Sequence, residues 1–146
     1  MSKKEVNSLK FAADAVEEML IRTAKSALTR AYAPYSNFAV GAAVRTTSGA
    51  IFPGCNVENA SFGLTMCAER VALCAAVSSG EREFSHIVLV AKQDEPLVPC
   101  GACRQVLAEL APGAEIIMTN TNGAIRRASV EDLLPAFFKL PHSVTK

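Results

Sequence analysis

Three shortages in the sequence narrow the functions it can have. None of the 146 residues falls in an apolar run near the roughly 20 residues that cross a bilayer, so we expect no membrane partner. The net charge is only +1, and no basic stripe with interleaved aromatic residues is present, so we expect no nucleic-acid partner. The two histidines, His86 and His142, are not spaced for metal ligation, and we expect both to be incidental.

The size and composition predict one soluble globular domain over residues 1–146. Half of the residues are hydrophobic, a fifth are charged, and no repeat or linker interrupts the chain. The first residues, Met1 to Glu5, are charged rather than leading into an apolar signal core, which predicts a cytoplasmic location. In that compartment the five cysteines are expected to be thiols, metal ligands or redox groups rather than disulfide partners.

Hydrophobic periodicity and turn residues predict an alternation of helices and strands after an initial hairpin. Such an order predicts a mixed sheet covered by helices on both faces, a three-layer α/β/α sandwich. The expected elements are a helix over 8–31, a hairpin of strands 38–46 and 50–57, a helix from 66 or 67 to 80, a strand over 86–92, a helix over 101–110, strands over 114–119 and 124–128, and a short helix starting near Ser129 and ending at Leu134.

Three cysteines stand at the starts of two predicted helices. Cys100 and Cys103 are three residues apart, so their sulfurs share one helix face within reach of one ion. The partial positive charge of a helix N-terminus lowers thiol pKa values and favours the thiolate that a metal needs. Adding Cys67 gives three sulfur ligands and leaves the fourth tetrahedral position open, which is typical of a catalytic Zn²⁺ site.

Charged residues beside these cysteines suggest further roles. Glu69 follows Cys67 by two residues, close enough to move protons between water and a substrate without binding the metal. Three thiolates and one Zn²⁺ carry a summed charge of −1, so nearby positive charge is needed to offset it. We expect Arg70 and Arg104, which adjoin the two cysteine motifs, to supply that charge.

Five segments between about residue 32 and residue 138 form one larger pattern. They are Tyr32-Ala-Pro-Tyr-Ser-x-Phe38-x-Val-Gly-Ala-Ala43, Gly54-Cys-Asn56-Val-Glu58-Asn-Ala60, Cys67-Ala-Glu-Arg70, Pro99-Cys-Gly-Ala-Cys-Arg-Gln105 and Leu133-Leu-Pro-x-x-Phe138. In order and spacing these segments resemble the small, three-cysteine zinc cytidine deaminases, a family of homotetramers.

The resemblance implies a fold, a reaction and a set of substrate contacts. The reaction would be the zinc-dependent hydrolysis of free cytidine and deoxycytidine to uridine and deoxyuridine with release of ammonia, a step of pyrimidine salvage. Phe38 would pack against the pyrimidine, and Asn56 and Glu58 would hydrogen-bond the ribose hydroxyls. The Ala68 backbone would contact the base edge, while Glu69 would bond the base and move protons.

The resemblance also implies a homotetramer whose sites borrow aromatic side chains from neighbouring subunits. Phe62 and Phe138 occupy the positions that would reach across. The sequence departs from the family pattern in having Phe62 where a tyrosine is frequent. Phe137 stands next to Phe138, although the spacing favours Phe138 as the residue that reaches the neighbouring site.

Four other readings of these motifs remain open. Within deaminases, the substrate could be another aminated pyrimidine nucleoside or a nucleoside antibiotic. The Cys-x-x-Cys pair could be a thioredoxin-like dithiol, or the zinc could be structural with Cys55 as a fourth ligand. The chain could also belong to the RNA-editing or RNA-binding deaminase-like proteins, although it lacks their basic surface. We expect Cys55 and Cys74 to be small buried hydrophobic residues.

Overall fold

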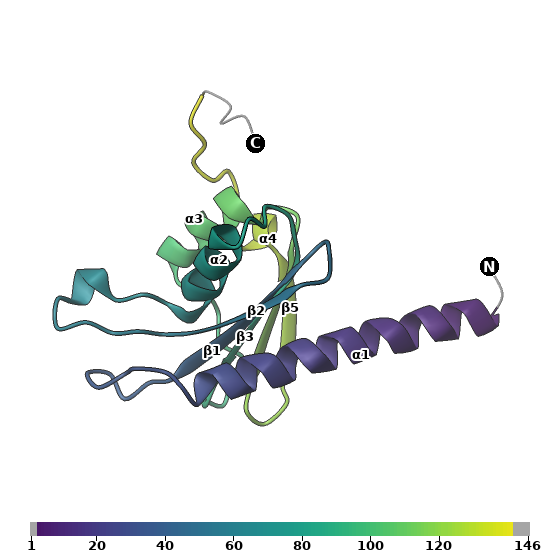
Figure 1. Cartoon of the computed structure of the whole chain (residues 1–146), viewed down its shortest axis with the longest axis horizontal. Helices are drawn as coiled ribbons and strands as arrows, with labels where there is room; N and C mark the ends of the chain where they lie inside the picture. The colour runs from purple at the N-terminus through teal and green to yellow at the C-terminus, as the bar shows by residue number, and fades with distance from the viewer. Residues whose placement is uncertain (1–2, 142–146) are drawn as a thin grey trace.

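The computed structural model describes the backbone of residues 3–141 and the side chains of residues 15–141 (Figure 1). His142 therefore lies outside the described residues. The elements are α1 (Lys3–Leu28), β1 (Val40–Thr46), β2 (Ile51–Cys55), the 3₁₀ turn η1 (Phe62–Leu64), α2 (Ala68–Ser78), β3 (Phe84–Ala91), α3 (Gly101–Leu110), β4 (Glu115–Asn120), β5 (Ile125–Ser129) and α4 (Val130–Leu133).

The five strands form one mixed sheet in the order β2-β1-β3-β4-β5. β3 and β4 run parallel, with Ile87 opposite Ile116, and the α3 crossover connects them. The remaining neighbours are antiparallel. The mixed sheet predicted from the sequence is therefore confirmed.

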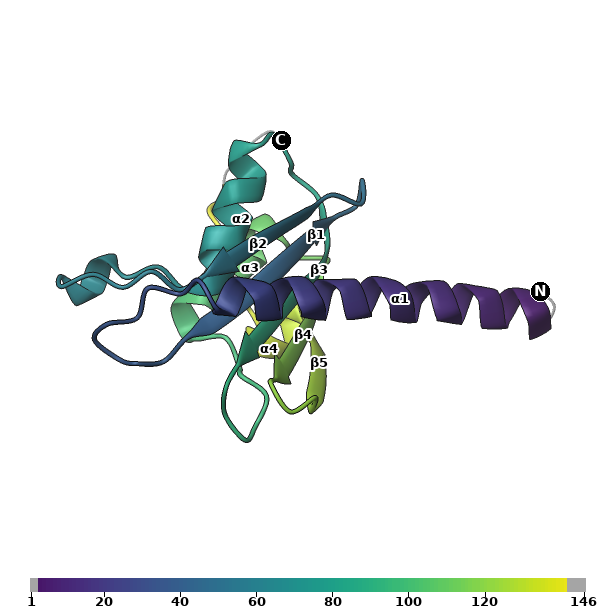
Figure 2. The ribbon, with the colours of Figure 1, turned by 60° about the horizontal axis from the view of Figure 1, so that its bottom comes forward.

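Helices cover both faces of this sheet, because its central strands carry apolar side chains on alternate sides. On one face Ala43, Val88 and Ile117 pack against Leu20 and Ala24 of α1. On the other face lies a larger core formed with α2, α3 and α4, to which β3 contributes Ile87 and Leu89 among others. Figure 1 and Figure 2 show α1 alone on its side and the three other helices opposite, which confirms the α/β/α sandwich.

The predicted elements agree with the structure to within a few residues at most ends. α3 has the bounds expected from the sequence, and α4 begins with the expected cap, in which Ser129 and Asp132 hydrogen-bond each other's backbone N–H groups. α1 differs most, because it starts at Lys3 instead of near residue 8 and ends at Leu28 instead of residue 31. In the part of the chain that the structure describes, no helix is both long and apolar enough to cross a membrane.

Two glycines in the hairpin let helices lie directly on the sheet. A Cβ atom placed on Gly41 would stand 2.0 Å from the Ala24 carbonyl oxygen of α1. A Cβ on Gly54 would stand 2.3 Å from the Ala68 carbonyl oxygen and 2.6 Å from the Ala72 nitrogen of α2. Since backbone atoms cannot move aside as flexible side chains can, Gly54 fixes how closely the first turn of α2 approaches β2.

Replacing Gly54 with alanine should therefore push α2 away from the sheet. Overpacking of this kind costs about 1–3 kcal/mol, and we expect Gly54→Ala to lower the free energy of unfolding by at least about 2 kcal/mol. Urea denaturation followed by circular dichroism measures this loss. Gly113→Ala is the matched control, because a Cβ there meets nothing within 4 Å. Equal stability of the two variants would contradict the close packing of α2 on β2.

Candidate metal centre and adjoining cavity

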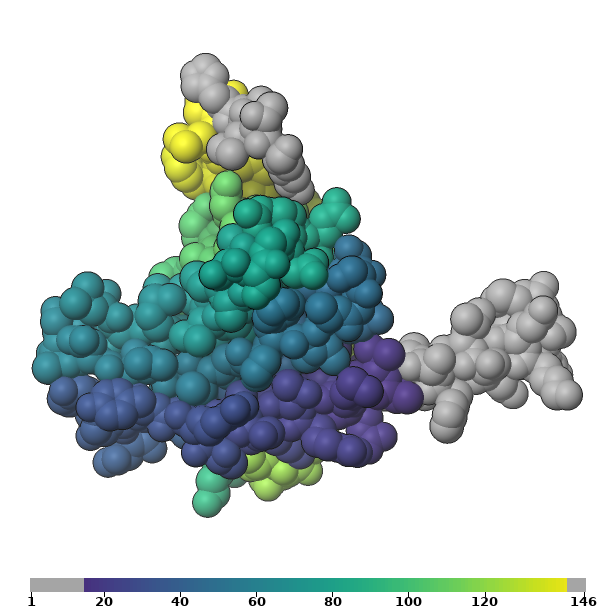
Figure 3. Space-filling view, viewed as in Figure 1, coloured from purple at the N-terminus to yellow at the C-terminus, as the bar shows by residue number. Residues whose placement is uncertain are grey.

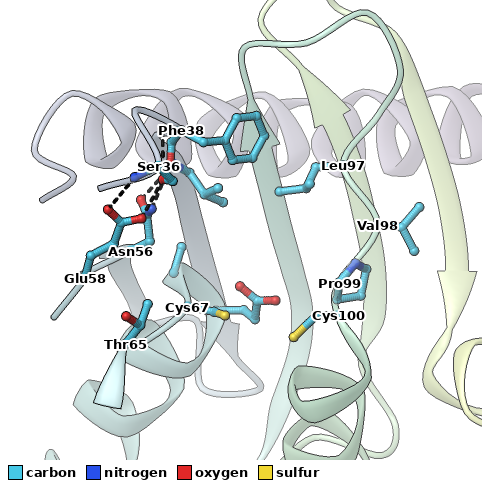
Figure 4. A pocket seen from close by; sticks show the side chains of 13 residues that line it. Ser36, Phe38, Asn56, Glu58, Thr65, Cys67, Leu97, Val98, Pro99 and Cys100 are labelled. Carbon is cyan, nitrogen blue, oxygen red and sulfur yellow. Dashed lines mark hydrogen bonds between the residues drawn. The ribbon is translucent and has the colours of Figure 1, made fainter. Parts of the chain in front are cut away.

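The structure brings Cys67, Cys100 and Cys103 together, with their three sulfur atoms within 4.8 Å of one another. Cys67 and Cys100 are the N-cap residues of α2 and α3, and both have extended backbones. Cys103 lies in the first turn of α3 and is fully buried. Figure 4 shows the Cys67 and Cys100 side chains pointing toward one another across the space between the two helices.

This arrangement fits a zinc ion. Zinc binds thiolate sulfur at about 2.3 Å, so tetrahedral ligands stand about 3.8 Å apart, a spacing that sulfurs within 4.8 Å reach by small side-chain rotations. Two helix N-termini meet at the cluster, and their partial positive charge stabilises thiolates. With three protein ligands, a fourth coordination position is left for water or substrate.

The thiol of Cys67 is poised to ionise. A hydrogen bond with Cys103, helped by the neighbouring Arg70 guanidinium, lowers the pKa of Cys67 to about 5. Arg70 Nη2 donates to the Cys67 sulfur at 3.5 Å and to the Thr65 carbonyl oxygen at 3.0 Å. Arg70 thus lies beside the sulfur whose negative charge it is predicted to offset.

Arg104 lies beside the cluster but makes different contacts. Its Nε donates to the Pro99 carbonyl oxygen and its Nη1 to the Leu133 carbonyl oxygen, each at 2.8 Å. These bonds tie the residue before Cys100 to the end of α4. Arg104 therefore braces the loop that carries Cys100, and its contribution of positive charge near the sulfurs stays a prediction.

Glu69 lies in the first turn of α2 and is only 3% exposed. Its burial raises the pKa of the carboxyl group above the ordinary glutamate value, because the charged form loses its hydration. Together with Cys67 and Ala68, it lines the cavity beside the sulfur cluster. A carboxyl group with a raised pKa next to a metal site is a typical carrier of protons.

A cavity of about 240 Å³ opens beside the cysteines, somewhat smaller than the roughly 300–1,000 Å³ of pockets for drug-sized ligands. One wall comes from the hairpin, another from the start of α2, and a third from the loop before α3 (Figure 4). Its size suits one small molecule. The lining residues are Ser36, Phe38, Val40, Asn56, Glu58, Thr65, Cys67, Ala68, Glu69, Leu97, Val98, Pro99 and Cys100.

The predicted substrate residues Phe38, Asn56, Glu58 and Ala68 all line this cavity. The side chain of Asn56 is buried. Its Oδ1 accepts a hydrogen bond from the Val40 N–H at 2.9 Å, and its Nδ2 donates one to the Phe38 carbonyl oxygen at 2.8 Å. The carboxylate of Glu58 accepts hydrogen bonds from the turn before β1. The bond from the Ser36 hydroxyl is the main reason why the pKa of Glu58 is lowered. Both polar side chains therefore organise the cavity wall as well as facing it.

The two aromatic residues expected to reach a neighbouring subunit are exposed. Phe62 is 74% and Phe138 68% exposed, and neither lines the cavity of its own chain. The ring of Phe62 meets that of Tyr35 edge to face, with centroids 5.8 Å apart. The loop that carries Phe62 and the loop that carries Tyr35 stand side by side at one side of the molecule (Figure 3).

The remaining cysteines correct one expectation. Cys74 is exposed on α2, and Cys55 is half-buried, so neither is the fully buried residue expected from the sequence. The thiol of Cys55 donates to the Arg30 carbonyl oxygen at 3.5 Å and stands apart from the three-sulfur cluster. Cys55 therefore does not complete a closed four-cysteine site among the described residues.

Several cavity residues were not predicted from the sequence. Ser36 and Thr65 come from loops, and Leu97, Val98 and Pro99 form the wall that leads to Cys100. Ser36 and Pro99 stand within the segments that carry the family resemblance, but no role was predicted for them. For Thr65, Leu97 and Val98 the only signal is proximity, since each lies within three residues of a predicted site residue.

Comparisons with known proteins agree with this geometry. Residues 14–119 match the family described as "Cytidine and deoxycytidylate deaminase zinc-binding region". A cytidine deaminase of Halalkalibacterium halodurans is 48% identical over 83% of this chain and 92% of its own, and one of Sporosarcina psychrophila is 47% identical over 83% and 90%. The crystal structure of a cytidine deaminase from Burkholderia pseudomallei superposes with a TM-score of 0.81 at 52% identity, over 83% of this chain and 98% of that one.

These similarities cover both cysteine motifs and most of the sheet. They confirm the family recognised from the sequence, its fold and its zinc cofactor, and the hydrolytic deaminase class of activity. The chain belongs to the cytidine and deoxycytidylate deaminase family.

Proposed function

We propose that the protein hydrolyses free cytidine and deoxycytidine to uridine and deoxyuridine, releasing ammonia, as a step of pyrimidine salvage. One observation supports this most strongly. Three cysteine sulfurs lie within 4.8 Å of one another, and two of these cysteines, Cys67 and Cys100, line a cavity together with the buried Glu69. The volume of this cavity suits one nucleoside. The names of the relatives point to the same substrate.

The chemistry divides between the metal centre and Glu69. A zinc ion held by Cys67, Cys100 and Cys103 would supply Lewis-acid activation of a water molecule for attack on C4 of the cytosine ring. Glu69 would carry one proton from the attacking water to ring N3, and then the proton of the new C4 hydroxyl group to the departing amine, so that the C4 carbonyl forms. Water is consumed, the C4–N bond breaks, and ammonia leaves with the uracil nucleoside as product.

The substrate's position follows from the cavity walls. Phe38 packs against the pyrimidine, the Ala68 backbone contacts the base edge, and Asn56 and Glu58 face the sugar hydroxyls. The carboxylate of Glu58 repels a 5′-phosphate placed near it, which favours a nucleoside over a nucleotide. Arg70 offsets the negative charge of the thiolates, and Arg104 holds the loop that carries Cys100.

The ultraviolet spectrum of cytidine, followed over time with purified zinc-loaded protein, tests the proposed reaction. We expect the cytosine spectrum to convert to the uracil spectrum with release of ammonia. The variant Glu69→Gln should bind zinc as before but lose at least about 100-fold in kcat, because the amide cannot carry the proton.

Glu109→Gln is the matched control, because Glu109 is exposed on α3 and does not line the cavity. A near-native rate for Glu69→Gln would contradict the role of Glu69. Zinc-loaded protein that leaves cytidine and deoxycytidine unchanged but deaminates another aminated pyrimidine nucleoside would contradict the proposed substrate and keep the reaction class.

We also propose that the protein is a cytoplasmic homotetramer with one domain over residues 1–146, without nucleic-acid or membrane partners. The exposed aromatic rings of Phe62 and Phe138 support an assembly, because large apolar side chains this accessible are candidates for burial against another subunit. In such an assembly Phe138 would complete the cavity of a neighbour.

Light scattering coupled to gel filtration measures the assembly. We expect a mass four times that of the 15.5 kDa chain. Phe138→Ala should shift this mass downward or raise KM, whereas Leu140→Ala, at a similarly exposed residue, should do neither. A monomeric, fully active protein would contradict the proposed assembly.

A further inference from the structure

The carboxylate of Glu58 is held in one orientation by the turn before β1. Its Oε1 accepts from the backbone N–H groups of Tyr35 at 2.9 Å and Ser36 at 3.1 Å. Its Oε2 accepts from the Ser36 hydroxyl at 2.5 Å. A carboxylate has about four acceptor positions, so this arrangement leaves one on Oε2 for a ligand in the cavity that Glu58 lines.

The same Ser36 hydroxyl also reaches the segment that carries Phe38. It accepts from the Phe38 N–H at 3.1 Å while it donates to Glu58. The Phe38 carbonyl oxygen in turn accepts from Asn56, as described above. One hydroxyl thus joins the carboxylate proposed to face the sugar to the backbone of the aromatic residue proposed to face the base (Figure 4).

The turn has few other bonds to hold it in place. It precedes the sheet, and Asn37 has a positive φ of 54°, a conformation that most residues adopt only at a cost. The Asn37 N–H donates a hydrogen bond to the Ala33 carbonyl oxygen at 3.0 Å. The backbone of Tyr32 donates one to the Asn56 carbonyl oxygen and accepts one from the Glu58 N–H. Between these points, the bonds to Glu58 and within the turn set the direction of Ser36 and Phe38.

We propose that Ser36 is a positioning residue for sugar recognition. Its hydroxyl orients the free acceptor position of Glu58 toward a secondary hydroxyl of the nucleoside and couples that contact to the placement of Phe38. This inference rests on the proposed function, since it requires that a pyrimidine nucleoside occupies the cavity. Without the hydroxyl, water replaces Ser36 at Oε2, and only the two backbone hydrogen bonds to Oε1 still hold the carboxylate, so the direction of Oε2 is no longer fixed.

Steady-state kinetics with two nucleosides that share the cytosine base test this role. Cytidine has both secondary hydroxyls, and 2′,3′-dideoxycytidine has neither. For Ser36→Ala we expect KM for cytidine to rise about tenfold with kcat lowered no more than about twofold, as for the loss of one hydrogen bond to a charged group. The selectivity in kcat/KM for cytidine over the dideoxynucleoside should fall by about the same factor.

Two further variants separate positioning from a general loss of structure. Ser36→Thr retains the hydroxyl and should recover most of the selectivity. Ser79→Ala, which removes a hydroxyl that bonds Ala75 at the far end of α2, should leave the selectivity as it was.

Equal losses on the two nucleosides, or an unchanged KM for cytidine, would overturn the role of Ser36 while the unmodified protein still deaminates. Failure of the unmodified protein to deaminate either nucleoside would overturn the proposed function and this inference with it.

Discussion

The place where two helices begin controls the whole candidate site. Cys67 and Cys100 are N-cap residues, so the distance between the first turns of α2 and α3 determines how near their sulfurs can come. That spacing is fixed from outside the site. Gly54 allows α2 to lie in direct contact with β2, and Arg104 braces the residue before Cys100 against α4. The metal ligands need no flexible loop of their own because the sandwich itself holds them.

The cavity is lined on one side by the hairpin region of the sheet and on the other by the starts of two helices. The antiparallel hairpin of β1 and β2 carries Asn56 and lies next to Glu58, so the groups proposed to face the sugar come from one continuous stretch of chain. The cysteines come from the starts of two helices on one face of the sheet. Placing sugar recognition and water activation on separate elements lets each be held rigidly. Short polar contacts such as those of Asn56 and Glu58 then hold the hairpin side.

The sequence predicted the features that depend on local patterns. The bounds of α3 and the Ser129–Asp132 cap were predictable because helix starts have short, specific signatures. The cysteine spacing was informative because three residues along a helix return to the same face. The family resemblance then implied the residues that line the cavity.

Features that depend on distant contacts were not predictable in the same way. The exposure of Cys74 depends on which face of α2 lies on the sheet, and periodicity near that residue does not settle it. The contacts of Arg104 depend on the position of α4, 29 residues along the chain. Ser36 lies 22 residues from its partner Glu58, and nothing in the intervening sequence indicates that a turn would bring them together.

The central claim is that three cysteines hold a zinc ion and leave one position open. X-ray absorption at the zinc edge of the purified protein measures the number and kind of atoms bound to the metal. We expect three sulfur neighbours at about 2.3 Å and one oxygen or nitrogen neighbour at about 2.0 Å. Four sulfur neighbours would mean a closed structural site and would contradict the proposed chemistry.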